Sequence, residues 1–224
     1  MNISNYDNKE SLCTIKDRIR ARKLFSEKET LLSTLAIISL LDELHKENGK
    51  LGYINIAASN FVCTSKIESN NIVMIDTSID ENLSEHYPPQ CTNENVCQAP
   101  EYFHGKFTEA SEVYAIGAMM YEMLFGIELW AINVDMLDET MKTLVLLKMK
   151  RKPLLVPSLT GVNPSNEMIT VIGKAVEYKP ESRYQSLDEL RTALSKLLPS
   201  SADGNKIKRN IRNGNGFADI AGMD

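Results

Sequence analysis

The sequence lacks several features that indicate common classes of function. No apolar run approaches the roughly 18 residues of a membrane span, and the polar N-terminus has no apolar stretch after a basic start. There are four cysteines and three histidines in 224 residues, with no C-x-x-C pair, which argues against a zinc site. The net charge of −5 is too small to indicate a nucleic-acid partner. We therefore expect a cytoplasmic protein with reduced thiols and no membrane contact.

Helical patterns dominate what is present. Ser26 and Glu29 have the spacing of a capping box, and apolar residues then recur at helical spacing, which predicts a helix over 26–48. The segment 109–125 is apolar nearly all round, which predicts a buried central helix. Further helices are predicted over 135–150, 165–178 and 186–198. The short apolar segments 61–64 and 71–75 predict a small β-hairpin.

Four segments stand in a particular order along the chain. They are LDELHKENGKLGYINIAASNFV, NIVMID, QAPEYFHGKFTEASEVYAIGAMMYEMLFG and AVEYKPESRYQSLDELRTAL. In this order they resemble the C-terminal lobe of a Ser/Thr protein kinase, over residues 28–198. The resemblance implies a mainly α fold of the α+β type, with helices around a buried central helix and a small β-hairpin.

The stretch GYINIAASNFV stands where the kinase family has its catalytic loop, H-R-D-x-x-x-x-N. Tyr53 and Ile54 replace the His and the Arg. Asn55 replaces the Asp, and an amide cannot accept the substrate's hydroxyl proton at neutral pH. Ala57 replaces the Lys that helps to neutralise the transferred phosphate. Asn60 is retained, and the resemblance implies that it could still bind a metal ion.

Other kinase motifs are kept to different degrees. D-F-G becomes D-T-S, in which Asp76 could still hold Mg²⁺. A-P-E is intact and ends at Glu101, which the resemblance pairs with Arg183 in a structural ion pair. Glu112 stands where the family has an Asp that holds the backbone of the catalytic loop. The architecture is therefore kept better than the catalytic groups.

Several of these residues also have a purely structural interpretation. Asn60 and Asp76 could be remnants that cap turns at strand ends. His45, with the other two histidines, is expected to be a solvated or core residue and not a base. The basic run KMKRK is expected to be a solvated helix end, with an acidic partner as the alternative.

Composition and the resemblance together divide the chain into four parts. Residues 1–27 are a polar lead-in, 28–198 the kinase-like lobe, and 199–215 a flexible linker rich in Ser, Gly and Asn. Residues 216–224 contain F-x-D-I-A-G-x-D, which resembles the opening of an AAA+ ATPase module. If this holds, the chain is part of a longer protein; the alternative is a disordered tail of chance sequence.

The leading hypothesis is a catalytically defective, pseudokinase-like module that acts as a binding or regulatory domain and that could control a linked AAA+ ATPase. The lead-in has no G-x-G-x-x-G, and the chain has no P-loop. We expect no required cofactor, with residual ATP and Mg²⁺ binding left open. We also expect a protein partner, or self-association, at the surface that a kinase N-lobe normally covers. The alternatives are a divergent active Ser/Thr kinase whose N-lobe is supplied elsewhere, and a purely structural subunit.

Overall fold

The computed structural model describes residues 13–48, 53–63, 72–75, 79–80, 89–93, 95–130, 133–158 and 163–198. Asp76, His86, the predicted linker and the AAA+-like tail lie outside these residues.

The fold is built around the buried helix α3 (Glu109–Phe125). All its side chains from Ala110 to Phe125 are buried, which confirms the prediction of a central helix. The helix begins at a capping box that Thr108 forms with Ser111. It ends at Gly126, whose φ of 71° lies in the left-handed region. A side chain at Gly126 would also meet Leu24, because a Cβ there would lie 2.6 Å from Leu24 Cδ2.

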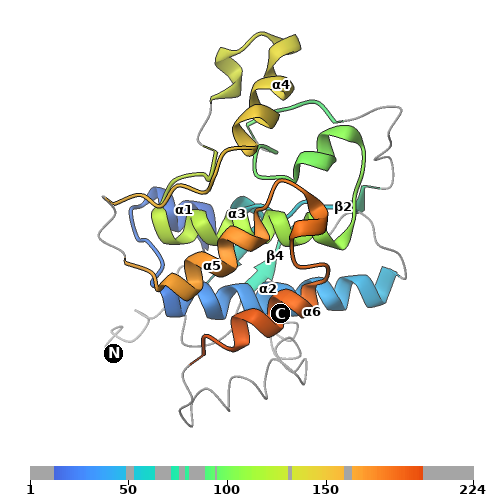
Figure 1. The fold of residues 1–224 in the computed structure, drawn as a ribbon. Coiled ribbons are helices and arrows are strands. Elements are labelled where there is room, and N and C mark those ends of the chain that lie inside the picture. Colours follow the sequence, from blue (N-terminus) through green and yellow to red (C-terminus); the bar gives the residue numbers. More distant parts are fainter. Residues whose placement is uncertain are drawn as a thin grey trace, which may run out of the picture.

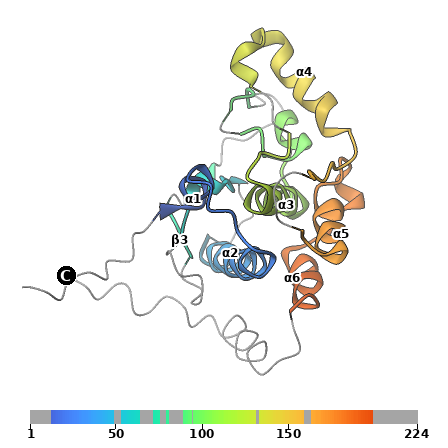
Figure 2. The same ribbon diagram turned by 90° about the vertical axis from the view of Figure 1, so that its left-hand side faces the viewer.

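Four helices surround α3. They are α1 (Ile15–Arg20), α2 (Glu27–Asn48), α5 (Asn166–Ala175) and α6 (Leu187–Ser195). In Figure 2, α3 is seen nearly end-on with these helices around it. Helices α3 and α5 approach closely at Gly117, where a Cβ would lie 2.8 Å from Ala175 Cβ, so any side chain there would force the two helices to shift.

Helix α4 (Glu139–Lys150) lies apart from this bundle. It projects at the top of Figure 1 and packs on the 3₁₀ helix η2 (Pro100–His104). The predicted helix over 135–150 is therefore shorter, and a separate 3₁₀ turn, η3 (Val134–Met136), precedes it. The helices predicted over 165–178 and 186–198 also end about one turn earlier in the structure, at Ala175 and Ser195, because the chain continues into turns there.

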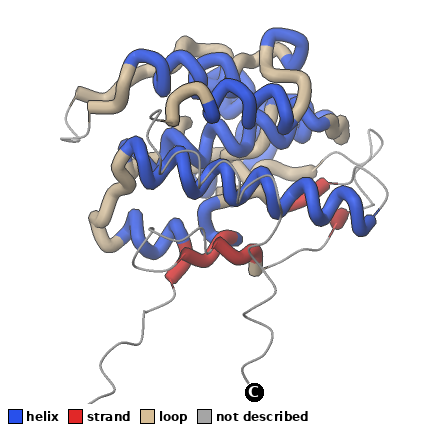
Figure 3. The backbone as a smooth tube through the Cα atoms, turned by 90° about the horizontal axis from the view of Figure 1, so that it is seen from below, coloured by secondary structure: helices blue, strands red, loops and turns tan. Residues whose placement is uncertain are grey.

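Two small antiparallel sheets lie at one side of the helices (Figure 3). The predicted hairpin is present as β3 (Phe61–Cys63) and β4 (Ile72–Met74), with Phe61 opposite Met74. Strand β1 (Cys13–Thr14) pairs with the other edge of β3. The second sheet pairs β2 (Tyr53–Ile54) with β5 (Ile79–Asp80). The strands β1, β2 and β5 are too short to show the alternation that predicts a strand.

The described part of the predicted polar lead-in, residues 13–27, belongs to the folded domain. From Cys13 onward it forms β1 and α1, and Ile15, Ile19 and Phe25 belong to the main hydrophobic core. The backbone N–H of Phe25 also donates to the carbonyl of Met123 at 3.0 Å. The pattern was easy to miss, because α1 places only two apolar residues, four positions apart, among charged ones.

None of the helices in the described ranges is both long and apolar enough to cross a membrane.

Candidate functional site

The loop that resembles a catalytic loop runs from β2 through the 3₁₀ turn η1 (Ala58–Asn60) into β3. Asn60 is 6% exposed, and its side-chain Nδ2 donates to the carbonyl oxygen of Asn55 at 3.0 Å. The backbone N–H of Asn60 donates to the carbonyl of Ala57 at 2.9 Å. The retained Asn60 therefore closes the loop on itself and brings together the three loop positions predicted from the sequence.

Two other parts of the chain are bonded to this loop. Ile56 is 1% exposed, and its carbonyl accepts a hydrogen bond from Gln98 Nε2 at 3.2 Å. The backbone N–H of Ile75, at the end of β4, donates to the carbonyl of Asn60 at 2.9 Å. The loop is thus held from the A-P-E side and from the hairpin side, although Asp76 itself lies outside the described residues.

The chemistry available at this loop is limited. Ala57 is 8% exposed, so a methyl group fills the position of the cation, and Asn55 is half-buried at the position of the base. Of the metal ligands that the resemblance implies, the described residues include only Asn60; its ligating atom would be Oδ1, while its Nδ2 donates to the loop. Proteins usually hold Mg²⁺ through one or two carboxylates in addition to phosphate oxygens.

Metal ligands are also few elsewhere in the described residues. Within them there is no group of three or more His, Cys, Asp and Glu side chains that could hold a metal ion. Residual binding of ATP and Mg²⁺ at Asn60 and Asp76 stays a prediction from the sequence.

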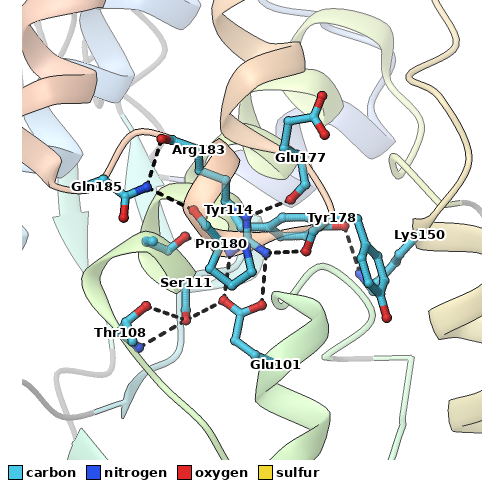
Figure 4. A network of polar contacts seen from close by, with 11 residues as sticks. Glu101, Thr108, Ser111, Tyr114, Lys150, Glu177, Tyr178, Pro180, Arg183 and Gln185 are labelled. Carbon is cyan, nitrogen blue, oxygen red and sulfur yellow. Dashed lines mark hydrogen bonds and ion pairs between the residues drawn. The ribbon is translucent and has the colours of Figure 1, made fainter.

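Glu101 and Arg183 form the pair that the sequence analysis predicted (Figure 4). The contact is bidentate: Nη1 lies 2.7 Å from Oε1 and Nη2 lies 2.9 Å from Oε2. Arg183 is 2% exposed, and the same guanidinium donates to three backbone carbonyls at 2.7 to 2.9 Å, those of Ala110, Glu177 and Tyr178. This one side chain therefore joins η2 to the start of α3 and to the turn between α5 and α6.

Glu112 is fully buried, and its hydrogen bond among the described residues goes to helix α2 and not to the loop. Its Oε1 lies 2.8 Å from Nε2 of His45 on α2, and its Oε2 has no hydrogen-bond partner among the described residues. Burial raises the pKa of Glu112, and the bond to Glu112 raises the pKa of His45. A Glu reaches one methylene further than the Asp of the kinase family, and here it ties α3 to α2. The sequence pattern did not indicate this pairing.

The prediction that KMKRK is a solvated helix end is wrong for Lys150. Lys150 is 1% exposed, and its Nζ donates to the carbonyl of Val96 at 2.6 Å and lies 3.4 Å from the hydroxyl of Tyr114. Burial lowers the pKa of Lys150 to about 7. A signal was available, since Lys150 follows the fully buried Leu146 by four positions and so shares its helix face.

The chain resembles known proteins in its fold and not detectably in its sequence. No profile of a known protein family matches the sequence, and no curated protein matches it. Among solved structures, the kinase PK-1 of Cydia pomonella granulovirus superposes with a TM-score of 0.58 at 17% sequence identity. The match covers 79% of this chain and 63% of the viral kinase.

The fold is protein kinase-like. The chain spans less than two thirds of the viral kinase's length. At this level of identity the likeness shows the fold alone, and function depends on the groups that this chain itself presents. The kinase-like fold agrees with the predicted central helix and hairpin.

Proposed function

We propose that this kinase-like domain is a binding or regulatory module without phosphotransferase activity. The observation that supports this most directly is the loop itself. Asn60 and Ile56 hold the loop in an ordered shape through hydrogen bonds, while Asn55 stands at the position of the catalytic base.

The loop lacks the catalytic base and the cation that phosphate transfer needs in the kinase family. A positioned general base contributes typically 10² to 10⁴-fold to a rate. The amide of Asn55 cannot take up a proton at neutral pH. Ala57 has no charge to offset the transferred phosphate, and its side chain is buried. Both losses affect the transition state, so tight substrate binding would not compensate for them.

A regulatory module also needs a partner. We propose a protein partner, or a second copy of the chain, at the surface that a kinase N-lobe normally covers. Ile75 supports this, because it is 59% exposed at the end of β4, next to the candidate loop. Control of a linked AAA+ ATPase rests on residues 216–224 and stays a prediction from the sequence.

The test is phosphate transfer from radiolabelled Mg·ATP to generic protein substrates, with an active Ser/Thr kinase as the positive control. We expect no transfer by the full chain above the level of a heat-denatured sample. Transfer that is lost in Asn60→Ala but kept in Ser59→Ala would overturn the proposal, because Ser59 is exposed in the same loop and serves as the matched control.

The alternative is a divergent active kinase, and the retention of Asn60 as a buried, ordered residue favours it. It requires an N-lobe supplied by another chain or by a region encoded upstream. The same assay on a longer product that contains a Gly-rich loop and a Val-Ala-x-Lys strand would test it. A shift of Tm with Mg·ATP fits the regulatory module, whereas a purely structural subunit predicts none.

A further inference from the structure

Two cysteines far apart in the sequence face each other across the three-stranded sheet. Strands β1 and β3 are antiparallel, and Cys13 and Cys63 are direct partners in their register. Directly opposite residues of such a pair project to the same side of the sheet, with Cα atoms about 4.5 to 5.5 Å apart. Disulfides span Cα separations of about 4.4 to 6.8 Å, so the backbone already has the required spacing.

The side chains agree with this spacing. The Sγ of Cys63 lies 3.6 Å from the carbonyl oxygen of Cys13. Both residues are thiols in this structure. The strand register and this contact therefore place the two side chains within reach of each other without a change of fold.

We propose that Cys13 and Cys63 are an oxidative modification site, at which a reversible cross-strand disulfide forms. The bond would fasten the N-terminal segment to the strand that directly follows the candidate loop. This inference is independent of the proposed lack of kinase activity.

The two thiols are suited to different steps. Cys13 is half-buried and can meet a small oxidant, whereas Cys63 is 1% exposed. Burial, with the neighbouring Cys13, raises the pKa of Cys63 to about 11, and the Arg18 guanidinium acts in the opposite direction. Cys13 is thus the group that reacts first, and Cys63 is the group that resolves the intermediate.

The reaction with a small-molecule disulfide RS–SR balances as two exchanges. The Cys13 thiolate attacks one sulfur of RS–SR, which forms a Cys13–S–SR bond and releases RS⁻. Cys63 then loses its proton, and its thiolate attacks the Cys13 sulfur and releases the second RS⁻. In total, two protein thiols and one RS–SR give one protein disulfide and two RSH. A reducing thiol reverses the sequence.

The other two cysteines do not share this arrangement. Cys91 is buried in a separate apolar cluster with Val96 and Tyr102. The Cys97 thiol lies 3.8 Å from the carbonyl of Ile56. Neither is a register partner of another cysteine among the described strands, so oxidation of the folded chain is expected to select Cys13 and Cys63.

The disulfide would act on the candidate loop through packing. Strand β1 and helix α1 both pack against η1, which holds Asn60. In the oxidised form this contact is covalently closed over a loop of about 50 residues, and constraint of the unfolded chain then raises Tm, on the order of 5 to 10 °C. In the reduced form, the pairing with β3 and the packing on η1 hold β1 without a covalent bond.

The experiment is mass spectrometry of the folded full chain after exposure to oxidised glutathione, with remaining thiols alkylated under denaturing conditions. We expect a Cys13–Cys63 linked peptide, alkylated Cys91 and Cys97, and a rise in Tm that a reductant reverses. Cys13→Ser should abolish both the linked peptide and the rise. The Cys91→Ser/Cys97→Ser double variant should keep both.

Two results would overturn the proposal. One is full alkylation of Cys13 and Cys63 after the folded wild type has been oxidised. The other is indiscriminate pairing, with Cys91 or Cys97 joined to Cys13 as often as Cys63 is. Since Cys63→Ser could disturb the core, Cys63→Ala serves as a second variant. It should fold, lose the linked peptide and leave Cys13 as a glutathione adduct.

Discussion

Replacement of Glu101 by Gln tests how much the buried ion pair with Arg183 contributes to stability. The change keeps the size of the side chain but removes the charge opposite a guanidinium that is 2% exposed. Removal of one partner of a buried pair typically costs about 3 to 5 kcal/mol. The three backbone carbonyls that still accept from Arg183 stay in place, so we expect the lower end, about 3 kcal/mol.

The expected loss is a large part of the free energy of unfolding of a folded domain, which is usually roughly 5 to 15 kcal/mol. For a chain of this size it corresponds to a fall in Tm of about 6 to 12 °C. Urea and thermal unfolding, followed by far-ultraviolet circular dichroism, would measure it. The double variant Glu101→Gln/Arg183→Met should cost less than the sum of the single changes, because neither charge is then left alone.

A matched control is the ion pair between Asp188 and Arg191 on α6, in which the carboxylate is exposed. The Asp188 side chain is 82% exposed, so Asp188→Asn should change stability by about 1 kcal/mol or less. Our reasoning is refuted if Glu101→Gln is as mild as Asp188→Asn, or if the costs of the two single changes at Glu101 and Arg183 simply add. Either result would mean that solvent or other groups stabilise the Arg183 guanidinium when the Glu101 carboxylate is absent.

Two further predictions concern other buried positions. Because the pKa of Lys150 is lowered to about 7, its amine in the unfolded chain binds a proton between that pH and about 10.5 that it does not bind in the folded chain, so the contribution of Lys150 to stability should rise with pH across this window. Lys150→Met should lower the slope of the free energy of unfolding against pH by up to about 1.4 kcal/mol per pH unit, measured by urea unfolding at several pH values. An unchanged slope would contradict the lowered pKa of Lys150. Gly117→Val should destabilise by about 1 to 3 kcal/mol or more, since even its Cβ would crowd Ala175 at 2.8 Å. Gly173→Ala is the control: its Cβ would approach no atom nearer than 3.7 Å, so thermal melts should show no loss, and equal losses would refute the packing argument.

Local sequence pattern was sufficient for the main helices and the hairpin. The Ser26–Glu29 capping box forms as predicted, with Glu29 Oε2 accepting from the Ser26 backbone N–H at 2.8 Å. The apolar run over 109–125 became the buried α3, because a helix that is apolar all round can be satisfied only inside other elements. These signals depend on residues within one or two turns of each other, so they can be seen along the chain.

Contacts between distant segments were much harder to predict. The resemblance to kinases indicated the Glu101–Arg183 pair, but nothing in the local pattern showed that Glu112 would meet His45. Lys150 was predicted to be solvated because charged helix ends usually are; instead, the carbonyl of Val96 and the hydroxyl of Tyr114 surround its ammonium group. Burial of a charge depends on what the rest of the fold places around it.

The sequence by itself determined the identities that bear most on activity: Asn55 where a base would stand, Ala57 where a cation would stand, and Asn60 retained. Only the tertiary structure decided that Asn60 closes the loop on Asn55, and that β1 lies beside β3 with Cys13 opposite Cys63. The physical reason is that composition and short periodicity record which groups exist and which local conformation they favour. Proximity between residues 50 positions apart is decided only when the core at α3 packs the segments together.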